Sequence, residues 1–319
     1  MPRSERTASA RRAAYGRRVR TALAVALVLV GAAPQLAAQA DTAPPPDAVP
    51  LLWRVQSDSA TLYIYGSIHA APPDAVPPPA IVRHAFTRSD TLVTEVVLGD
   101  DLTERLGAAM AARSELPAGT TLQSFFDESE WSSVRRWASG AGIPLESIEP
   151  LQPWLVEMLV AETGGFPEGF TAENGLDTYF SAKATASRMP QAGLETLEEQ
   201  LDALAGGRLE EQARSLLHAV EGAGEPGRIE RLYEAWRSGD TPAIAAMIDE
   251  QYGRPELAGT YNRLFTMRNE AWMAPLVDHL SGTATTFDVV GAGHLVGRDS
   301  VVELLRDRGY AVTRVTRHE

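Results

Sequence analysis

Segments that read as β-strands lie near both ends of the chain, and the residues between them have helical periodicity. The strand-like segments are residues 51–56, 61–65, 92–97, 286–290 and 311–316. If the two ends folded separately, the N-terminal piece would have three strands and the C-terminal piece two. Each would be too small to be stable alone. The sequence therefore predicts an α/β fold in one domain, residues 51–319, with a single sheet built from the N- and C-terminal strands.

The middle of the chain, from about residue 102 to about residue 282, is predicted to be a long helical insertion. One short strand at residues 191–195 interrupts it. Outside the insertion, further helices are expected at residues 80–88 and 298–308. Inside it, helices are expected at residues 102–113, 129–138, 154–162, 176–187, 197–221, 227–238, 241–252 and 255–280.

The first 40 residues have the composition of a secretory signal peptide. Seven arginines precede an apolar run at residues 21–33, and an Ala-Gln-Ala cleavage site follows at 38–40. The apolar run is shorter than the roughly 20 residues that a transmembrane helix needs. We expect export to the periplasm or the medium, with no membrane span after cleavage and a proline-rich linker at residues 41–50; an uncleaved anchor is the alternative.

Composition excludes several classes of protein. The chain of 319 residues has 42 acidic and 29 basic residues, and the seven basic residues before position 41 would leave with the signal peptide. Such an acidic balance argues against nucleic acid as a partner. The absence of cysteine excludes disulfides and thiolate metal ligands, so any metal would be held by nitrogen and oxygen.

Two predicted strands end in the same local motif, a glycine followed three residues later by a histidine. The first pair is Gly66 and His69, and the second is Gly291 and His294. Glycine lets the backbone turn sharply as it leaves a sheet, and ligand crevices of open α/β sheets lie beyond the C-terminal ends of strands. The repeated motif predicts two histidines at one crevice. Two unrelated loop histidines are the alternative.

Glu95 lies within the predicted strand at 92–97, where an unpaired carboxylate is costly. It is either paired with an arginine or joined to His69 and His294 in one site. In the second case, the two imidazoles and the carboxylate suit a divalent metal, which would activate water for hydrolysis. A metal-free site, with one histidine as general base, is equally consistent with the sequence.

Two further residues are weaker candidates for the site. Glu195 ends the short predicted strand and either faces the crevice or has a surface role. Arg268 either contacts an anionic substrate or Glu95, or lies on a solvated helix face. The glycines at 291, 293 and 297 resemble a dinucleotide-binding turn, but the βα units that such a site needs are missing.

Several segments together resemble the TraB/GumN family, which is related to Tiki-type proteases and more distantly to erythromycin esterases. The matching segments are LWR at 52–54, YIYGSIHA at 63–70, TLVTEVV at 91–97, PW at 153–154, GLD at 175–177, LET at 194–196, RN at 268–269 and GAGHLVG at 291–297 followed by the remaining residues to 315.

This resemblance implies an exported or membrane-tethered α/β protein with His69, Glu95 and His294 in its active site. In Tiki-like members the site is that of a metal-dependent peptidase that prefers manganese or cobalt. The chain lacks the C-terminal transmembrane segment of those members, which argues against a membrane-bound substrate.

We therefore expect an exported, metal-dependent hydrolase of the peptidase kind, acting on a peptide or small-molecule substrate. Manganese, cobalt or zinc would be held by His69, Glu95 and His294, with Glu195 and Arg268 as further catalytic candidates. The alternative is a non-catalytic accessory protein that binds envelope polysaccharide or peptide. The sequence predicts no oligomeric state.

Overall fold

The structure is a computed structural model that describes residues 49–99, 102–163, 167–223, 225 and 227–316. The predicted signal peptide and residues 41–48 of the predicted linker lie outside this range. The described residues form two compact units. The α/β unit comprises those within 31–100, 166–207 and 225–319, and the helical unit comprises those within 101–165 and 208–224.

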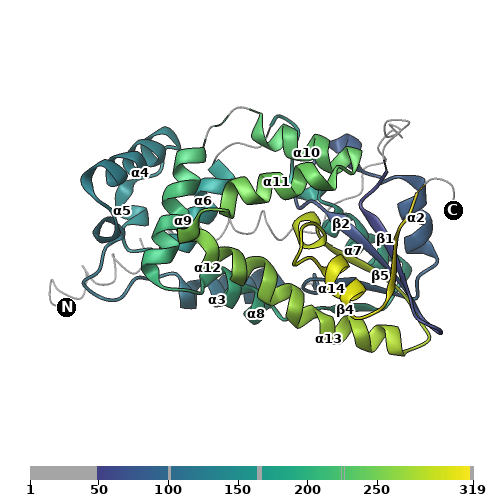
Figure 1. Ribbon diagram of the computed structural model, residues 1–319. Helices are drawn as coiled ribbons and strands as arrows, with labels where there is room; N and C mark the ends of the chain where they lie inside the picture. Colours follow the sequence, from purple (N-terminus) through teal and green to yellow (C-terminus); the bar gives the residue numbers. More distant parts are fainter. Residues whose placement is uncertain (1–48, 100–101, 164–166, 224, 226, 317–319) are drawn as a thin grey trace, which may run out of the picture. The chain divides into compact units, whose positions relative to one another are not determined.

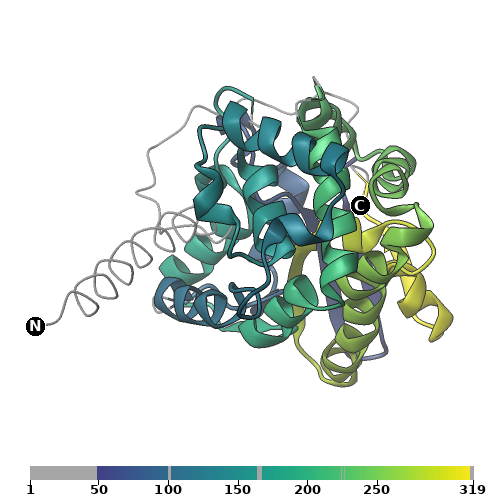
Figure 2. The same ribbon diagram turned by 90° about the vertical axis from the view of Figure 1, so that its left-hand side faces the viewer.

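The α/β unit contains one six-stranded sheet with strand order β4-β3-β5-β2-β1-β6. The strands are β1 (Leu52–Gln56), β2 (Thr61–Ser67), β3 (Thr91–Thr94), β4 (Gln191–Gly193), β5 (Thr285–Gly291) and β6 (Ala311–Arg314). The yellow C-terminal strands lie beside the purple N-terminal hairpin (Figures 1 and 2). The predicted α/β fold with a single sheet is confirmed; beside the strands from the two ends of the chain, the sheet also contains β4, which comes from within the predicted helical insertion.

Four neighbouring strands of this sheet run parallel. β5 lies between β2 and β3, and β4 pairs with the other side of β3. β1 is antiparallel to both β2 and β6. As a result, the C-terminal ends of β2, β5, β3 and β4 meet at one edge of the sheet, which is where open α/β sheets place their ligands.

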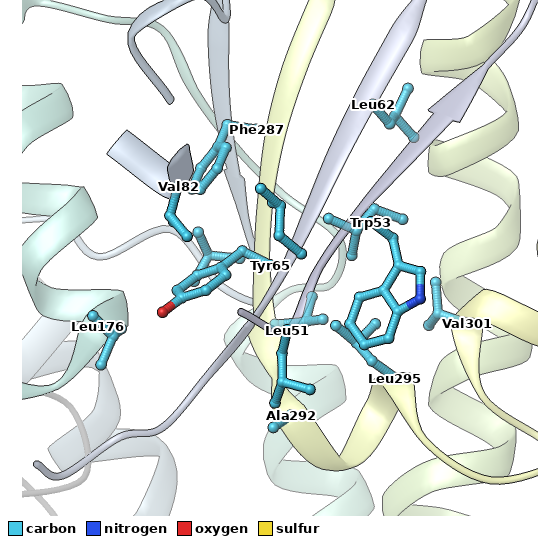
Figure 3. Close-up of a cluster of buried hydrophobic side chains, with 14 of the residues drawn as sticks. Leu51, Trp53, Leu62, Tyr65, Val82, Leu176, Phe287, Ala292, Leu295 and Val301 are labelled. Carbon is cyan, nitrogen blue, oxygen red and sulfur yellow. The ribbon is translucent and has the colours of Figure 1, made fainter. Parts of the chain in front are cut away.

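Helices cover both faces of the sheet. α2 (Ala80–Thr87) and α7 (Leu176–Ser187) cover the face that carries an aromatic cluster of Tyr65, Phe86, Phe180 and Phe287. α13 (Met267–Ser281) and α14 (Val301–Asp307) cover the other face. Figure 3 shows Tyr65 and Trp53 on opposite sides of the strands, with Leu295 next to Trp53. The buried Leu295 thus fixes the turn that follows β5.

The α/β unit contains further helices, most of them short. They are η2 (Pro73–Ala75), η4 (Ala172–Asn174), α8 (Leu197–Ala205), α10 (Arg228–Ser238), α11 (Thr241–Tyr252), η5 (Pro255–Leu257), α12 (Ala258–Tyr261), η6 (Asn262–Thr266) and η7 (Ala292–Leu295).

The helical unit consists of α3 (Leu102–Arg113), η3 (Leu122–Phe125), α4 (Glu128–Gly140), α5 (Leu145–Ile148), α6 (Pro153–Thr163) and α9 (Leu209–Gly222). α9 packs against both α6 and α4. The buried Trp154 donates from its indole N–H to the carbonyl of Arg113 at 3.1 Å. In the part of the chain that the structure describes, no helix has both the length and the apolar character needed to cross a bilayer.

Several predicted elements differ from the observed ones. The strand expected at 191–195 is β4, which ends at Gly193, so Glu195 lies beyond the strand and does not end it. The helix expected at 197–221 is two helices, because the chain turns at Gly206 and Gly207, and Gly207 has a φ of +84°. The helix expected at 255–280 is four consecutive segments, of which residues 262–266 form a π-helix. β3 ends at Thr94, so Glu95 lies just beyond the strand and not inside it.

Candidate functional site

The predicted site residues come together because each follows the C-terminal end of a parallel strand. His69 lies two residues after β2, Glu95 one residue after β3, and Glu195 two residues after β4. His294 lies in η7, directly after β5. Since these four strands are neighbours, their following residues converge at one edge of the sheet. Both histidines of the Gly-x-x-His motifs lie beyond a strand end, and Gly291 is the last residue of β5, whereas Gly66 lies inside β2, which ends at Ser67.

Arg268 joins two of these residues into a buried ion cluster, which we define as Glu95, Glu195 and Arg268. Its Nη2 lies 2.6 Å from Glu95 Oε2 and 2.5 Å from Glu195 Oε1, and its Nε donates to both oxygens of Glu195 at 3.1 Å. The side chains are only 13%, 9% and 7% exposed for Arg268, Glu95 and Glu195. One cation therefore serves two buried carboxylates.

The π-helix η6 ends at Thr266, two residues before Arg268. Such π-helical segments occur frequently at functional sites. Trp272, one helical turn further along α13, donates from its indole N–H to Glu195 Oε2 at 3.1 Å. The guanidinium also lies 4.9 Å from the centre of the Trp272 ring. Trp272 thus holds the cluster from the α13 side.

The two carboxylates of the cluster have opposite pKa shifts. Burial alone would raise the pKa of Glu95, but Arg268, His69 and a hydrogen bond from the Gly291 N–H lower it to about 2. Burial raises the pKa of Glu195, and Arg268 offsets this only in part, since the Glu95 charge lies nearby. Glu95 is therefore a fixed negative charge at neutral pH.

His294 is a buried, neutral imidazole. Burial lowers its pKa to about 3, although the Glu95 charge acts in the opposite direction. Its Nδ1 lies 2.6 Å from Asn269 Oδ1, and its Nε2 lies 3.1 Å from Nη1 of Arg268. Both ring nitrogens are therefore already engaged by α13.

His69 lies in a different environment. Its side chain is 50% exposed, and its Nδ1 contacts Asp177 Oδ2 at 3.0 Å. The other carboxylate oxygen of Asp177 accepts a hydrogen bond from Ser67 Oγ at 2.8 Å. Asp177 raises the pKa of His69 to about 9, against the opposing effect of burial. This imidazole is thus held by a carboxylate and still reaches solvent.

Gly175 permits this contact, because the start of α7 lies against the backbone of the His69 loop. A Cβ at position 175 would lie 2.3 Å from the carbonyl oxygen of His69. Asp177 is the second residue of α7, where a carboxylate is also stabilised by the helix dipole.

Three predicted site residues share one small space beside Gly291. Around the point where a Cβ of that residue would sit, Glu95 Oε1 lies at 3.3 Å, His294 Cδ2 at 3.6 Å and His69 Nε2 at 3.9 Å. The two histidines therefore belong to a single site, with His69 on its solvent side and His294 on its buried side.

The donors in this site do not fit a metal ion as they are arranged. A ligand nitrogen must direct its lone pair at the metal from about 2 Å, and that of His294 Nε2 is engaged by a guanidinium. Among the described residues, no group of three or more His, Asp or Glu side chains has the geometry of a metal site. Binding of a divalent metal stays a prediction.

Residues that the sequence did not single out complete the site. Asp177 and Asn269 lie within segments that resemble the family, but nothing in the sequence marks them as site residues. Nothing in the sequence marks Ser67 or Gln200 as a site residue either. Gln200 donates to Glu95 Oε2 at 3.2 Å. Their types are common and their spacing is irregular, so only the Gly-Leu-Asp start of α7 carried a signal.

Two other sequence features lie outside the site. His84 is exposed in α2, and His318 lies outside the described residues. Of the glycines that resemble a dinucleotide-binding turn, Gly293 is covered by Phe265 and Ile248, whose side chains would be 2.9 and 3.3 Å from a Cβ there. A phosphate thus has no open approach to that turn.

Fold and site define an α/β protein with a buried carboxylate–guanidinium cluster and a carboxylate-held histidine at the edge of a parallel sheet. The chain belongs to the TraB/PrgY/gumN family, whose model matches residues 51–314. It is similar to an "Uncharacterized protein" of Treponema pallidum (strain Nichols), with 21% identity over 276 residues, which are 81% of this chain and 80% of the relative. No solved structure matches the chain.

Proposed function

We propose that this protein is an exported hydrolase that cleaves an ester or amide bond by general-base catalysis at His69. The observation that carries the proposal is the contact between His69 and Asp177. It occupies Nδ1 and leaves Nε2 facing the space that Glu95 Oε1 also faces. A half-exposed imidazole held by a carboxylate is the arrangement that proton transfer to and from a substrate requires.

In the proposed reaction, neutral His69 accepts a proton from water at Nε2 while the water oxygen attacks the substrate carbonyl carbon. The tetrahedral intermediate then collapses, and the imidazolium of His69 returns the proton to the leaving oxygen or nitrogen. Glu95 and Asp177 both favour the imidazolium, so they stabilise the charge that forms on His69 during the first step.

The remaining predicted catalytic residues act through Glu95 in this proposal. Arg268 keeps Glu95 ionised and in place, and Glu195 holds Arg268 from the other side. Arg268 is not free to bind an anionic substrate. The hydrogen bonds of its guanidinium are already directed at Glu95, Glu195, His294 and the carbonyl of Leu264.

The test is hydrolysis of a panel of chromogenic esters and fluorogenic peptides by the purified full chain, once with a chelator and once with added Mn²⁺, Co²⁺ or Zn²⁺. We expect turnover in the presence of the chelator, loss of turnover in His69→Gln, and no change in His84→Gln, which alters an exposed histidine in α2.

Two outcomes would overturn the proposal. Turnover that requires an added metal would restore the metal-dependent peptidase that the family resemblance implies. Binding of envelope polysaccharide or peptide without cleavage of any probe would favour the non-catalytic accessory protein. Export is tested separately, by the N-terminal sequence of the protein recovered from the periplasm or the medium.

A further inference from the structure

The two ring nitrogens of His294 can be assigned from the groups that they face. Asn269 is only 2% exposed, and its Nδ2 donates to the carbonyl of Asp299 at 2.8 Å. Its Oδ1, an acceptor, is therefore the atom that faces His294 Nδ1 at 2.6 Å. Since an amide oxygen cannot donate, Nδ1 of His294 must carry the hydrogen.

The other nitrogen of His294 must then be the acceptor. Arg268 has only donors, and its Nη1 lies 3.1 Å from His294 Nε2. Glu95 Oε1, at 3.9 Å from the same nitrogen, is too distant for a hydrogen bond. The lone pair of Nε2 is thus used by the guanidinium and is directed away from the solvent side of the site.

We propose that His294, the histidine of the second Gly-x-x-His motif, is a positioning residue for Arg268. Asn269 fixes its tautomer, and its Nε2 orients the guanidinium that holds Glu95 beside His69. In this role His294 neither accepts a proton from water nor binds a metal. The effect on catalysis rests on the proposed function, whereas the tautomer and the absence of metal binding do not.

The surroundings of the ring support this role. His294 lies between Trp272 and Phe265, with ring centres 4.4 Å and 5.3 Å away, and it is only 5% exposed. A proton-transfer residue must reach water or substrate, and His69 meets that condition while His294 does not.

The direct test is the long-range ¹H–¹⁵N spectrum of the full chain labelled with ¹⁵N-histidine at neutral pH. The His294 signals are those that disappear in His294→Gln. We expect the neutral Nδ1–H tautomer, with an Nε2 that accepts a hydrogen bond. An imidazolium or an Nε2–H tautomer would overturn the proposal.

Variants of Asn269 separate positioning from a merely structural role. Asn269→Asp keeps an acceptor opposite Nδ1 of His294 and should keep the Nδ1–H tautomer. Asn269→Leu replaces the amide with an apolar side chain of similar volume that cannot accept a hydrogen bond, and the Nδ1–H tautomer should be lost. Loss of the tautomer is expected to lower kcat by roughly 10–100-fold with little change in KM, by analogy with the partners that orient metal-ligating histidines, whose loss costs that much. An unchanged tautomer in Asn269→Leu would contradict the role given to Asn269, and far-UV circular dichroism verifies folding.

Metal binding is tested on the same samples by adding Zn²⁺ alone. The Nε2 resonance of His294 should not move at Zn²⁺ concentrations that shift the exposed histidines. His294→Gln, whose side-chain oxygen can also accept from Arg268, should retain more activity than His294→Ala. A Zn²⁺-dependent shift of the His294 Nε2 resonance, or equal loss in both variants, would show that positioning is not its role. Because the spectra need no substrate, they stand even if the hydrolase proposal fails.

Discussion

Glu95 and Glu195 reach the same guanidinium because their backbones are hydrogen-bonded to each other: the Glu195 N–H donates to the Glu95 carbonyl at 2.9 Å. This bond lies just beyond the last paired residues of β3 and β4, which are Thr94 and Gly193. Two carboxylates thus leave adjacent strands on the same side, where their repulsion requires a cation between them. Arg268, from α13, supplies it.

Removing this cation should strongly destabilise the protein. In Arg268→Met, Glu95 and Glu195 stay buried without their partner, and we expect a loss of about 3–5 kcal/mol in the free energy of unfolding. Urea denaturation monitored by circular dichroism measures it. Arg306→Ala breaks an exposed pair with Glu303 and should cost less than about 1 kcal/mol. Equal losses in the two variants would mean that the cluster does not stabilise the fold.

The charge of Asp177 should set the pH dependence of hydrolysis. Because only neutral His69 accepts a proton, and because Asp177 raises its pKa to about 9, activity should rise with pH until about pH 9. Asp177→Asn removes the negative charge, so the rising limb should shift toward the ordinary histidine value near 6.5, and kcat should fall by roughly 100-fold or more. If the pH–rate profile of Asp177→Asn matches that of the wild type, Asp177 does not set the pH dependence of hydrolysis.

A methyl group at position 175 should separate Asp177 from His69. Gly175→Ala places a Cβ 2.3 Å from the His69 carbonyl oxygen, so either α7 or the His69 loop must move, at a cost of about 1–3 kcal/mol. Thermal melts and the pH–rate profile report the two effects. Gly140→Ala, at a helical position with nothing within 4 Å of the added methyl, is the matched control and should not be destabilising. If Gly175→Ala and the wild type melt at the same temperature, the close approach of α7 to the His69 loop does not contribute to stability.

Asp288 should make the protein less stable as the pH rises through neutrality. This fully buried carboxyl in β5 accepts a hydrogen bond from Thr286 at only one of its oxygens, and burial raises its pKa to about 7. A folded-state pKa above the unfolded value of 3.8 gives stability that is complete below about pH 4 and is lost as the pH rises through 7.

Asp288→Asn removes this titration. Relative to wild type, the variant should gain up to about 4 kcal/mol in the free energy of unfolding between pH 4 and pH 9, which is the difference of the two pKa values expressed as energy. Urea denaturation at several pH values measures the gain. The control is Asp278→Asn, at an exposed position in α13, which should show no such trend with pH. If the difference in free energy of unfolding between Asp288→Asn and wild type is the same at every pH, Asp288 does not have a raised pKa.

The sequence carried local information about this site that proved sufficient for its main outline. The end of the apolar pattern marked approximately where β2 and β5 stop, so the placement of His69 and His294 beyond strand ends followed from local chemistry. The end of β3 was less certain, because Val96 and Val97 continue the apolar pattern although pairing with β5 stops at Thr94. β5 itself continues to Gly291, so β3 ends because its own chain leaves the sheet after Thr94, which the apolar pattern does not show.

The sequence by itself determined the sheet formed from both chain ends and the two histidines at its edge, because strand periodicity and the point where it ends are local properties. Only the tertiary structure decided what those histidines contact. Arg268 meets Glu95 across 173 residues of sequence, and His69 meets Asp177 across 108. A hydrogen bond depends on which donor and acceptor atoms converge, and for contacts so distant in sequence that convergence is fixed by packing.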